Sequence, residues 1–219
     1  MKKISKADLS INELIDLIKE DFLETDNLIK NQITSDVDRI PQLSSHIIDL
    51  GGKRLRPILT IACAKMLNVK NNHHITLAAA VELLHTATLL HDDVVDESNF
   101  RRGKETSHKI WDNKSSILVG DYLLGKAFQL MVKTGSLECL KTLSNAAAII
   151  AEGEVLQLVA INNINIKKND YIKIIESKTA ALFSSACEVG GIISNSPEKI
   201  NKLLFSFGKN LGTSFQLID

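Results

Sequence analysis

The fold of this chain is organised around the stretch LLHTATLLHDDVVD, residues 83–96. It ends a longer helical run, from Ile75 to about Val95, whose interior is apolar nearly all round. Such a helix is expected at the centre of a bundle. Asp92 and Asp96 would lie one turn apart on one face of it, with His85 two turns earlier near the same line.

Helical spacing also dominates the rest of the chain, and β-branched alternation is nowhere sustained. Asp170 is expected to cap the helix that follows it, and the polar residues 97–114 are expected to form an exposed loop. The sequence therefore predicts an all-α protein, with residues 1–219 forming a single bundle domain of about eight helices. The expected helices are 8–29, 37–49, 57–67, 75–95, 116–132, 137–161, 170–193 and 197–219.

Composition excludes several classes of protein. Lys plus Arg and Asp plus Glu both number 26, which gives no case for a nucleic-acid partner. Three distant cysteines and no secretory signal favour the cytoplasm. No window holds the roughly 18 uninterrupted apolar residues of a transmembrane segment, although contact with a membrane surface stays open.

The acidic end of the central helix predicts a metal site. Three carboxylates at Asp92, Asp93 and Asp96 are badly placed at a helix C-terminus, where the dipole is already negative. Magnesium is usually held by one or two carboxylates together with substrate phosphates, and Asp92 and Asp96 supply such a pair. The alternative is a solvated acidic helix end.

Two basic clusters predict phosphate binding. The run GGKRLRP at residues 51–57 combines glycines, which permit close backbone approach, with three cations at a helix start. Arg101 and Arg102 could each pair with phosphate oxygens of a different ligand. The alternatives are a basic helix cap and an exposed arginine pair. Taken with the acid pair and the apolar bundle, these clusters suggest two diphosphate substrates with apolar tails.

At this point the chain resembles the trans-type polyprenyl diphosphate synthases, most closely the long-chain, octaprenyl-type branch. The resemblance covers essentially the whole chain and implies the isoprenoid-synthase type of helical bundle. The motifs that carry it, in order, are GGKRLRP (51–57), HTATLLHDDVVDES (85–98), RRGK (101–104), VGDY (119–122), AEGE (151–154), SKTA (177–180) and GTSFQLID (212–219).

The resemblance implies a role for each matching residue. The catalytic set would be Asp92, Asp93, Asp96 and Lys178, with magnesium held by Asp92, Asp96 and Asp219. Isopentenyl diphosphate would be bound by Lys53, Arg56, His85 and Arg102. The allylic diphosphate would be bound by Arg101, Lys178, Thr179 and Gln216.

The implied reaction is magnesium-dependent condensation of isopentenyl diphosphate with an allylic diphosphate, farnesyl diphosphate being expected, to a long all-trans product for quinone side chains. A homodimer is also implied. Small side chains at Ala87 and Thr88 would let the growing tail pass, and a deeper residue such as Met131 or Leu130 would stop it. A terpene cyclase shares the acid motif but does not need the isopentenyl site.

One departure from the family pattern concerns the second aspartate-rich motif, of which this chain carries the first aspartate, Asp219. The rest of that motif and the family's last helices are expected to be absent. Two interpretations stay open: a prenyltransferase or the larger part of one, and a truncated non-catalytic remnant or subunit with weak or no activity alone.

Overall fold

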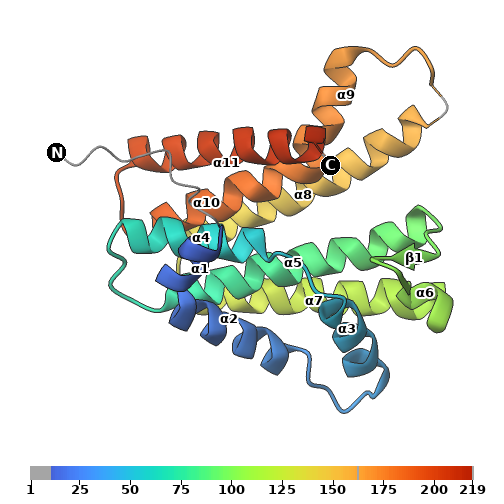
Figure 1. Ribbon diagram of the computed structural model, residues 1–219, viewed down its shortest axis with the longest axis horizontal. Coiled ribbons are helices and arrows are strands. Elements are labelled where there is room, and N and C mark those ends of the chain that lie inside the picture. Colours follow the sequence, from blue (N-terminus) through green and yellow to red (C-terminus); the bar gives the residue numbers. More distant parts are fainter. Residues whose placement is uncertain (1–10, 162, 219) are drawn as a thin grey trace.

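The computed structural model describes residues 11–161 and 163–218 (Figure 1). Within these residues the regular secondary structure is helical apart from one two-stranded antiparallel hairpin. This confirms the all-α prediction. The elements are α1 (Ile11–Leu17), α2 (Lys19–Gln32), α3 (Arg39–Asp49), α4 (Leu55–Met66), α5 (His73–Val95), β1 (Phe100–Arg101), β2 (Lys104–Glu105), α6 (Ser107–Ile110), α7 (Asn113–Lys133), α8 (Leu137–Ala160), α9 (Lys168–Ile175), η1 (Glu176–Ala180), α10 (Ala181–Ile193) and α11 (Glu198–Ile218).

The structure differs from the sequence prediction in its details. The first expected helix is broken at Ile18 into α1 and α2. Asp170 is not an N-cap: α9 begins at Lys168, with Lys167 extended before it, so Asp170 lies in the first turn. Residues 97–114 are not one loop, because they contain the hairpin and the short helix α6. Helix α7 begins at Asn113 because the Asp112 side chain accepts from the Ser115 amide at 2.7 Å.

Helix α5 runs through the middle of the bundle (Figure 1). All residues from 77 to 84 are buried, so this part of the helix is covered on every side. It packs most extensively against α7, and it also contacts α2, α4 and α10. The expected central helix is therefore confirmed, and its C-terminal turns carry polar groups to one end of the bundle.

A buried polar contact ties α2 to the start of α5. Asp21 of α2 accepts from Nε2 of the buried His74 at 3.0 Å and pairs with Lys65 of α4, also at 3.0 Å. The other ring nitrogen of His74 lies 2.9 Å from the carbonyl oxygen of Asn71. Both ring nitrogens thus face acceptors, which holds three helices together at the end of α5 that lies opposite the acidic residues.

Helix α8 is unusual in its exposure. Among the described helices it is the one that is long and apolar enough to cross a membrane by length and composition alone. Only 22% of its most apolar 18-residue window is buried. The helix contains no uninterrupted apolar run of that length, because charged residues such as Glu152 interrupt it, and so no transmembrane segment is predicted from the sequence.

Two glycines make a matched test of the packing. A methyl group at Gly208 of α11 would collide with the carbonyl oxygen of Phe183 in α10, whereas one at Gly125 of α7 meets nothing within 4 Å. We expect Gly208→Ala to lower the free energy of unfolding by about 1–3 kcal/mol and Gly125→Ala to raise it by about 0.5–1 kcal/mol. Urea denaturation measures both, and equal effects would contradict the close α10–α11 approach.

Candidate functional site

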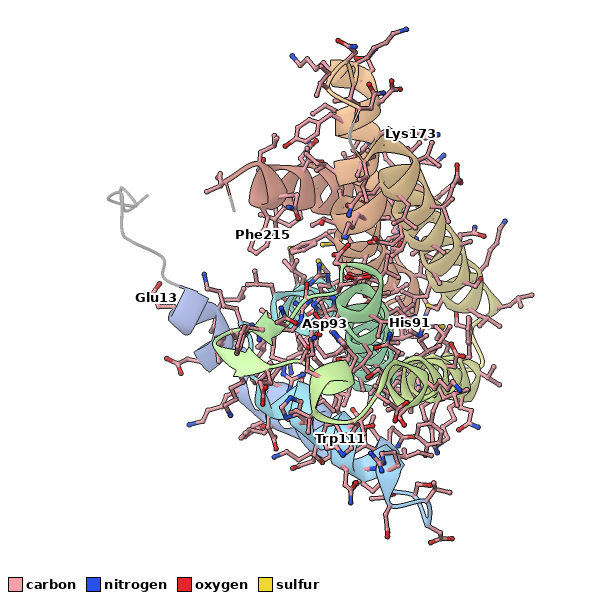
Figure 2. All side chains as sticks on the ribbon, turned by 90° about the vertical axis from the view of Figure 1, so that its right-hand side faces the viewer. Glu13, His91, Asp93, Trp111, Lys173 and Phe215 are labelled. Atoms are coloured by element: carbon pink, nitrogen blue, oxygen red, sulfur yellow. The ribbon has the colours of Figure 1, made fainter. Side chains whose placement is uncertain are left out.

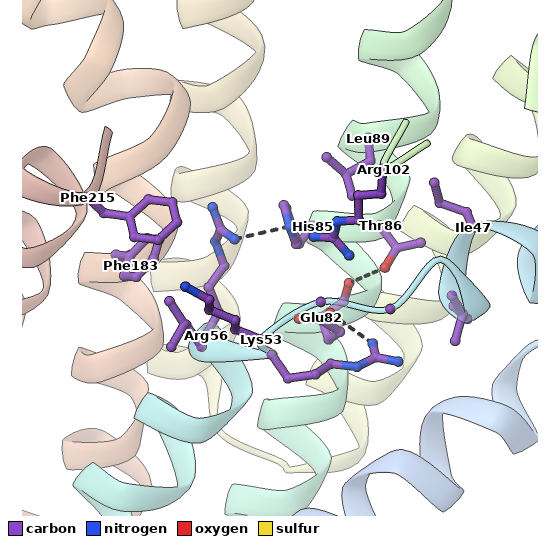
Figure 3. Close-up of a pocket in the computed structure, with 15 residues that line it drawn as sticks. Ile47, Lys53, Arg56, Glu82, His85, Thr86, Leu89, Arg102, Phe183 and Phe215 are labelled. Carbon is purple, nitrogen blue, oxygen red and sulfur yellow. Dashed lines mark hydrogen bonds and ion pairs between the residues drawn. The ribbon is translucent and has the colours of Figure 1, made fainter. Parts of the chain in front are cut away.

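A cavity of about 430 Å³ opens between the loop before α4 and the helices α5, α10 and α11 (Figure 3). The four residues predicted for isopentenyl diphosphate all lie around it, although they come from three separate motifs. The described residues that line it are Ile47, Ile48, Gly51, Gly52, Lys53, Arg54, Leu55, Arg56, Glu82, His85, Thr86, Leu89, Arg102, Phe183 and Phe215.

The loop that forms one wall of the cavity needs its glycines. Gly51 and Gly52 have φ angles of 73° and 157°, which L side chains rarely adopt. A Cβ atom at Gly52 would also lie 2.8 Å from Nη1 of Arg102. The glycine therefore lets the Arg102 guanidinium lie directly against the backbone of the loop.

Arg56 is the most constrained cation of the cavity. Its guanidinium lies 4.6 Å from the centre of the Phe183 ring, and its Nη1 donates to Nε2 of His85 at 3.1 Å. Its Nε is buried without a hydrogen-bond partner. Burial lowers the pKa of Arg56 to about 10, with Glu82 opposing the shift. The cation is therefore poorly compensated by the protein and favours a bound anion.

His85 is neutral in this setting. Burial, followed by the positive charge of Arg56, lowers the pKa of His85 well below its usual value. Nε2 then acts as the acceptor for Arg56 and the proton resides on Nδ1. His85 also lines the cavity, unlike a histidine enclosed in the apolar core.

The predicted acid pair lies at the C-terminal end of α5. Asp96 caps the helix, and its amide donates to the carbonyl oxygen of Asp92 at 2.8 Å. Burial raises the pKa of Asp92 to about 7, opposed by Lys178. The carboxylates of Glu154 and Asp96 raise this pKa further.

This donor set fits a divalent cation. No cluster of three or more His, Cys, Asp or Glu side chains poised to hold a metal occurs within 11–161 and 163–218. Magnesium needs fewer, because it keeps several waters and takes the rest of its ligands from phosphates. The crowding of negative charge around Asp92 is what such an ion would relieve. Asp219, the third expected ligand, lies outside the described residues.

The two successive arginines face different partners, because they sit on a tight hairpin. Arg102 and Gly103 form its turn with φ angles of 52° and 78°, and Arg102 reaches the cavity. Arg101 binds the buried Asp93 with both its Nη2 and its Nε, at 2.7 and 2.9 Å. Figure 2 looks onto the end of the bundle where Asp93 and His91 lie.

A π-helical turn, η1, brings the remaining predicted residues together. Lys178 pairs with Glu154 of α8 at 3.0 Å, and the Thr179 hydroxyl donates to the Gln216 side chain of α11 at 2.8 Å. Such turns insert one extra residue and are frequent at functional sites. Sequence periodicity over 170–193 indicated one regular helix and did not reveal this turn.

The residues predicted to control product length are not part of this cavity. Ala87, Thr88 and Met131 are absent from the described lining of the cavity. Ala87 and Met131 are buried in the main apolar core together with Leu130. Thr88 is half-buried, and its hydroxyl donates to the carbonyl oxygen of His85 at 2.7 Å. It lies one turn before Asp92 on α5.

Sequence reasoning assigned no role to Glu82, Phe183 and Phe215, although all three line the cavity, and Arg54 was predicted only as one cation of the basic cluster. The signal for Glu82 was available, since it is an acidic residue in an otherwise apolar helix three positions before His85. The two phenylalanines gave no signal, because aromatic residues at helical spacing are ordinarily part of the core.

The all-α fold, the basic cavity and the acidic end of α5 are those of an isoprenoid-synthase type of protein. Comparison with known proteins agrees. The Polyprenyl synthetase family model matches residues 37–219. The chain belongs to this family. It is 44% identical over 211 residues to octaprenyl diphosphate synthase of Escherichia coli, covering 96% of this chain and 65% of that protein.

Solved structures of the family share the fold closely. A decaprenyl diphosphate synthase from Rhodobacter capsulatus superposes with a TM-score of 0.93 at 50% identity, over 95% of this chain and 64% of that one. A polyprenyl synthase from Caulobacter crescentus, complexed with calcium and isoprenyl diphosphate, gives 0.94 at 46% identity, over 97% and 65%. The chain thus spans about 65% of the length of these relatives.

The neutral state of His85 predicts a pH dependence of stability. Below about pH 6.5 the unfolded chain binds a proton at His85 that the folded chain does not, so this residue makes folding less favourable as pH falls. The variant His85→Gln keeps an acceptor for Arg56 but does not titrate. We expect the unaltered chain to lose about 1–2 kcal/mol more unfolding free energy than this variant between pH 6.5 and 5. Urea denaturation at both pH values measures the difference, and equal losses would contradict a neutral His85.

Proposed function

We propose that the chain carries out, or contributes the larger part of, trans-polyprenyl diphosphate synthesis. Isopentenyl diphosphate would be condensed with an allylic diphosphate, with farnesyl diphosphate as the expected primer. The observation that carries the proposal is the buried, poorly compensated guanidinium of Arg56, in a cavity that it shares with Lys53, His85 and Arg102. A buried cation of this kind is costly unless an anion joins it.

Isopentenyl diphosphate would place its diphosphate in this cavity. Arg56 and Arg102 would donate to phosphate oxygens, and the exposed Lys53 would add charge at the rim. The apolar part of the substrate would lie against Leu89, Phe183 and Phe215, which exclude water from the reacting double bond.

The allylic diphosphate would lie beyond His85, between the end of α5 and η1. Lys178, which now pairs with Glu154, would turn to the leaving diphosphate, with Thr179, Gln216 and Arg101 nearby. Asp93 would hold Arg101 in place through their two-point contact. Asp92 and Asp96 would hold magnesium, which when bound stabilises the negative charge of the departing diphosphate.

Product length would depend on small side chains near the acid pair. Ala87 and Thr88 lie about one turn before Asp92 on α5, and Met131 and Leu130 lie deeper in the core. A tail that starts at the allylic site would pass Thr88 and end near the α5–α7 contact. This supports a long product suited to a quinone side chain.

We place the chain, as one isoprenoid-synthase-like domain, in a homodimer in the cytoplasm. The exposed apolar residues on α7 and α8 support pairing of two copies there, and they include Ile117, Leu118, Ile149, Val155, Leu158 and Val159. The three buried, unpaired cysteines fit a reducing compartment. Release of an apolar product would require brief contact with a membrane surface.

A second candidate is a non-catalytic remnant or subunit of such a synthase. The chain spans about 65% of its relatives' length. Such a protein would bind isopentenyl diphosphate without turning it over. Binding and turnover therefore have to be measured separately.

The deciding experiment follows labelled isopentenyl diphosphate with farnesyl diphosphate, with and without Mg²⁺, while calorimetry measures isopentenyl diphosphate binding. The first candidate predicts binding and Mg²⁺-dependent prenyl products, and the second predicts binding alone. Arg56→Met should weaken binding about 100-fold or more, without loss of thermal stability, because it removes a buried charge. Arg39→Met, at an exposed arginine of α3, is the control and should bind normally. Normal binding by Arg56→Met would contradict the proposed site.

Thr88 offers a test of product length. We expect Thr88→Phe to shorten the main product by several isoprene units, because the ring would block the path one turn below Asp92. Chromatography with mass detection measures the products. Ser206→Phe adds the same ring at an exposed position of α11 and should leave product length unchanged. An unaltered length in Thr88→Phe would place the path elsewhere.

A further inference from the structure

Glu82 is a buried carboxylate inside a site that is otherwise cationic. It lies on α5, three residues before His85, and is 8% exposed. Of the described residues that line the cavity, it is the single acidic one. A negative charge there opposes the binding of a diphosphate by Coulomb repulsion. A carboxylate at this position is therefore expected to favour diphosphate binding in some other way that outweighs the repulsion.

Glu82 makes a close ion pair with Arg54. Its Oε1 accepts from Nη1 of Arg54 at 2.8 Å, and the two side chains are only 10% and 16% exposed. On its other side, Nε of Arg54 lies 3.7 Å from Asp26 of α2. The Arg54 side chain thus runs between α2 and α5 (Figure 3 shows the contact with Glu82), and its guanidinium is held more closely by Glu82 than by Asp26.

Arg54 occupies the point where the glycine loop becomes helix α4. Its backbone is left-handed, with φ 49° and ψ 36°, a conformation that non-glycine residues adopt only when their surroundings hold them. Lys53 precedes this point and Arg56 follows it by two residues. The orientation of the Arg54 backbone therefore sets the direction of both cations relative to the cavity.

We propose that Glu82 is a positioning residue: by holding Arg54, it fixes the glycine loop and the start of α4 so that Lys53 and Arg56 face the diphosphate. The inference rests on the proposed isopentenyl diphosphate site. The negative charge of Glu82 also raises the pKa of Arg56 against the effect of burial, which helps to keep that guanidinium protonated. In this role Glu82 acts through Arg54 and not on the substrate.

The direction of the effect of Glu82→Gln tests the proposal. If the carboxylate acted only by Coulomb repulsion of the diphosphate, its removal would strengthen diphosphate binding. We expect the opposite, a roughly tenfold weaker binding of isopentenyl diphosphate by calorimetry, because the two cations are no longer held in place. Binding by the variant that equals or exceeds that of the unaltered chain overturns the inference alone. No binding by the unaltered chain overturns the proposed site, and this inference with it.

Two further variants separate positioning from general stability. In an Arg54→Gln background, Glu82→Gln should cause little additional loss, because both act through one contact; additive losses overturn the inference. Asp26→Asn removes the same charge from the more distant partner of Arg54 and should change binding less than twofold. Should Glu82→Gln fail to fold, Glu82→Asp keeps the charge and shortens the reach, and it should also weaken binding. Unchanged binding in a folded Glu82→Asp would then overturn the proposal.

Discussion

The burial of α5 on every side is the constraint on which the rest of this structure depends. A helix that is covered over residues 77–84 cannot present a polar face along that length. Apart from Glu82, the proposed site residues of this helix therefore lie from His85 onward, toward the end that carries Asp92 and Asp93. The two sites proposed for charged ligands thus share one helix, with His85 at one and Asp92 at the other. Their separation along α5 is set by helix geometry.

Some charged groups near the two proposed sites have an ion-pair partner in the protein, and others are poorly compensated. Arg101 is matched by Asp93, Lys178 by Glu154, and Arg54 by Glu82. As it does at His85, burial displaces the pKa values of both Arg56 and Asp92 against their charged forms. One is a cation that lacks an anion, and the other is an anion that lacks a cation. The charges of Arg56 and Asp92 are therefore poorly compensated by the protein. A diphosphate has the sign of charge that suits Arg56, and a metal ion has the sign that suits Asp92.

The sequence predicted the helical class, the central helix and the three clusters because each depends on local pattern. Apolar periodicity marks α5, and the spacing of Asp92 and Asp96 places them on one face whatever the tertiary structure. What it did not reveal depends on contacts between distant segments. The pairing of Glu82 with Arg54 spans 28 residues, and the contact of Thr179 with Gln216 spans 37. The hairpin was missed because two strands of two residues leave no periodic signal, although Arg102-Gly103 is a recognisable turn.

Because of the π-turn η1, the number of residues between α9 and α10 determines how the faces of these two helices are oriented relative to each other. Its extra residue offsets the faces of the two helices by about 100°. Loss of one residue within 176–180 would restore a regular helix, and regular helices are the more stable form. The same loss would turn Lys178 and Thr179 away from the side chains that now meet them. At this point, a shortening that stabilises the helix would therefore break the contacts of Lys178 with Glu154 and of Thr179 with Gln216.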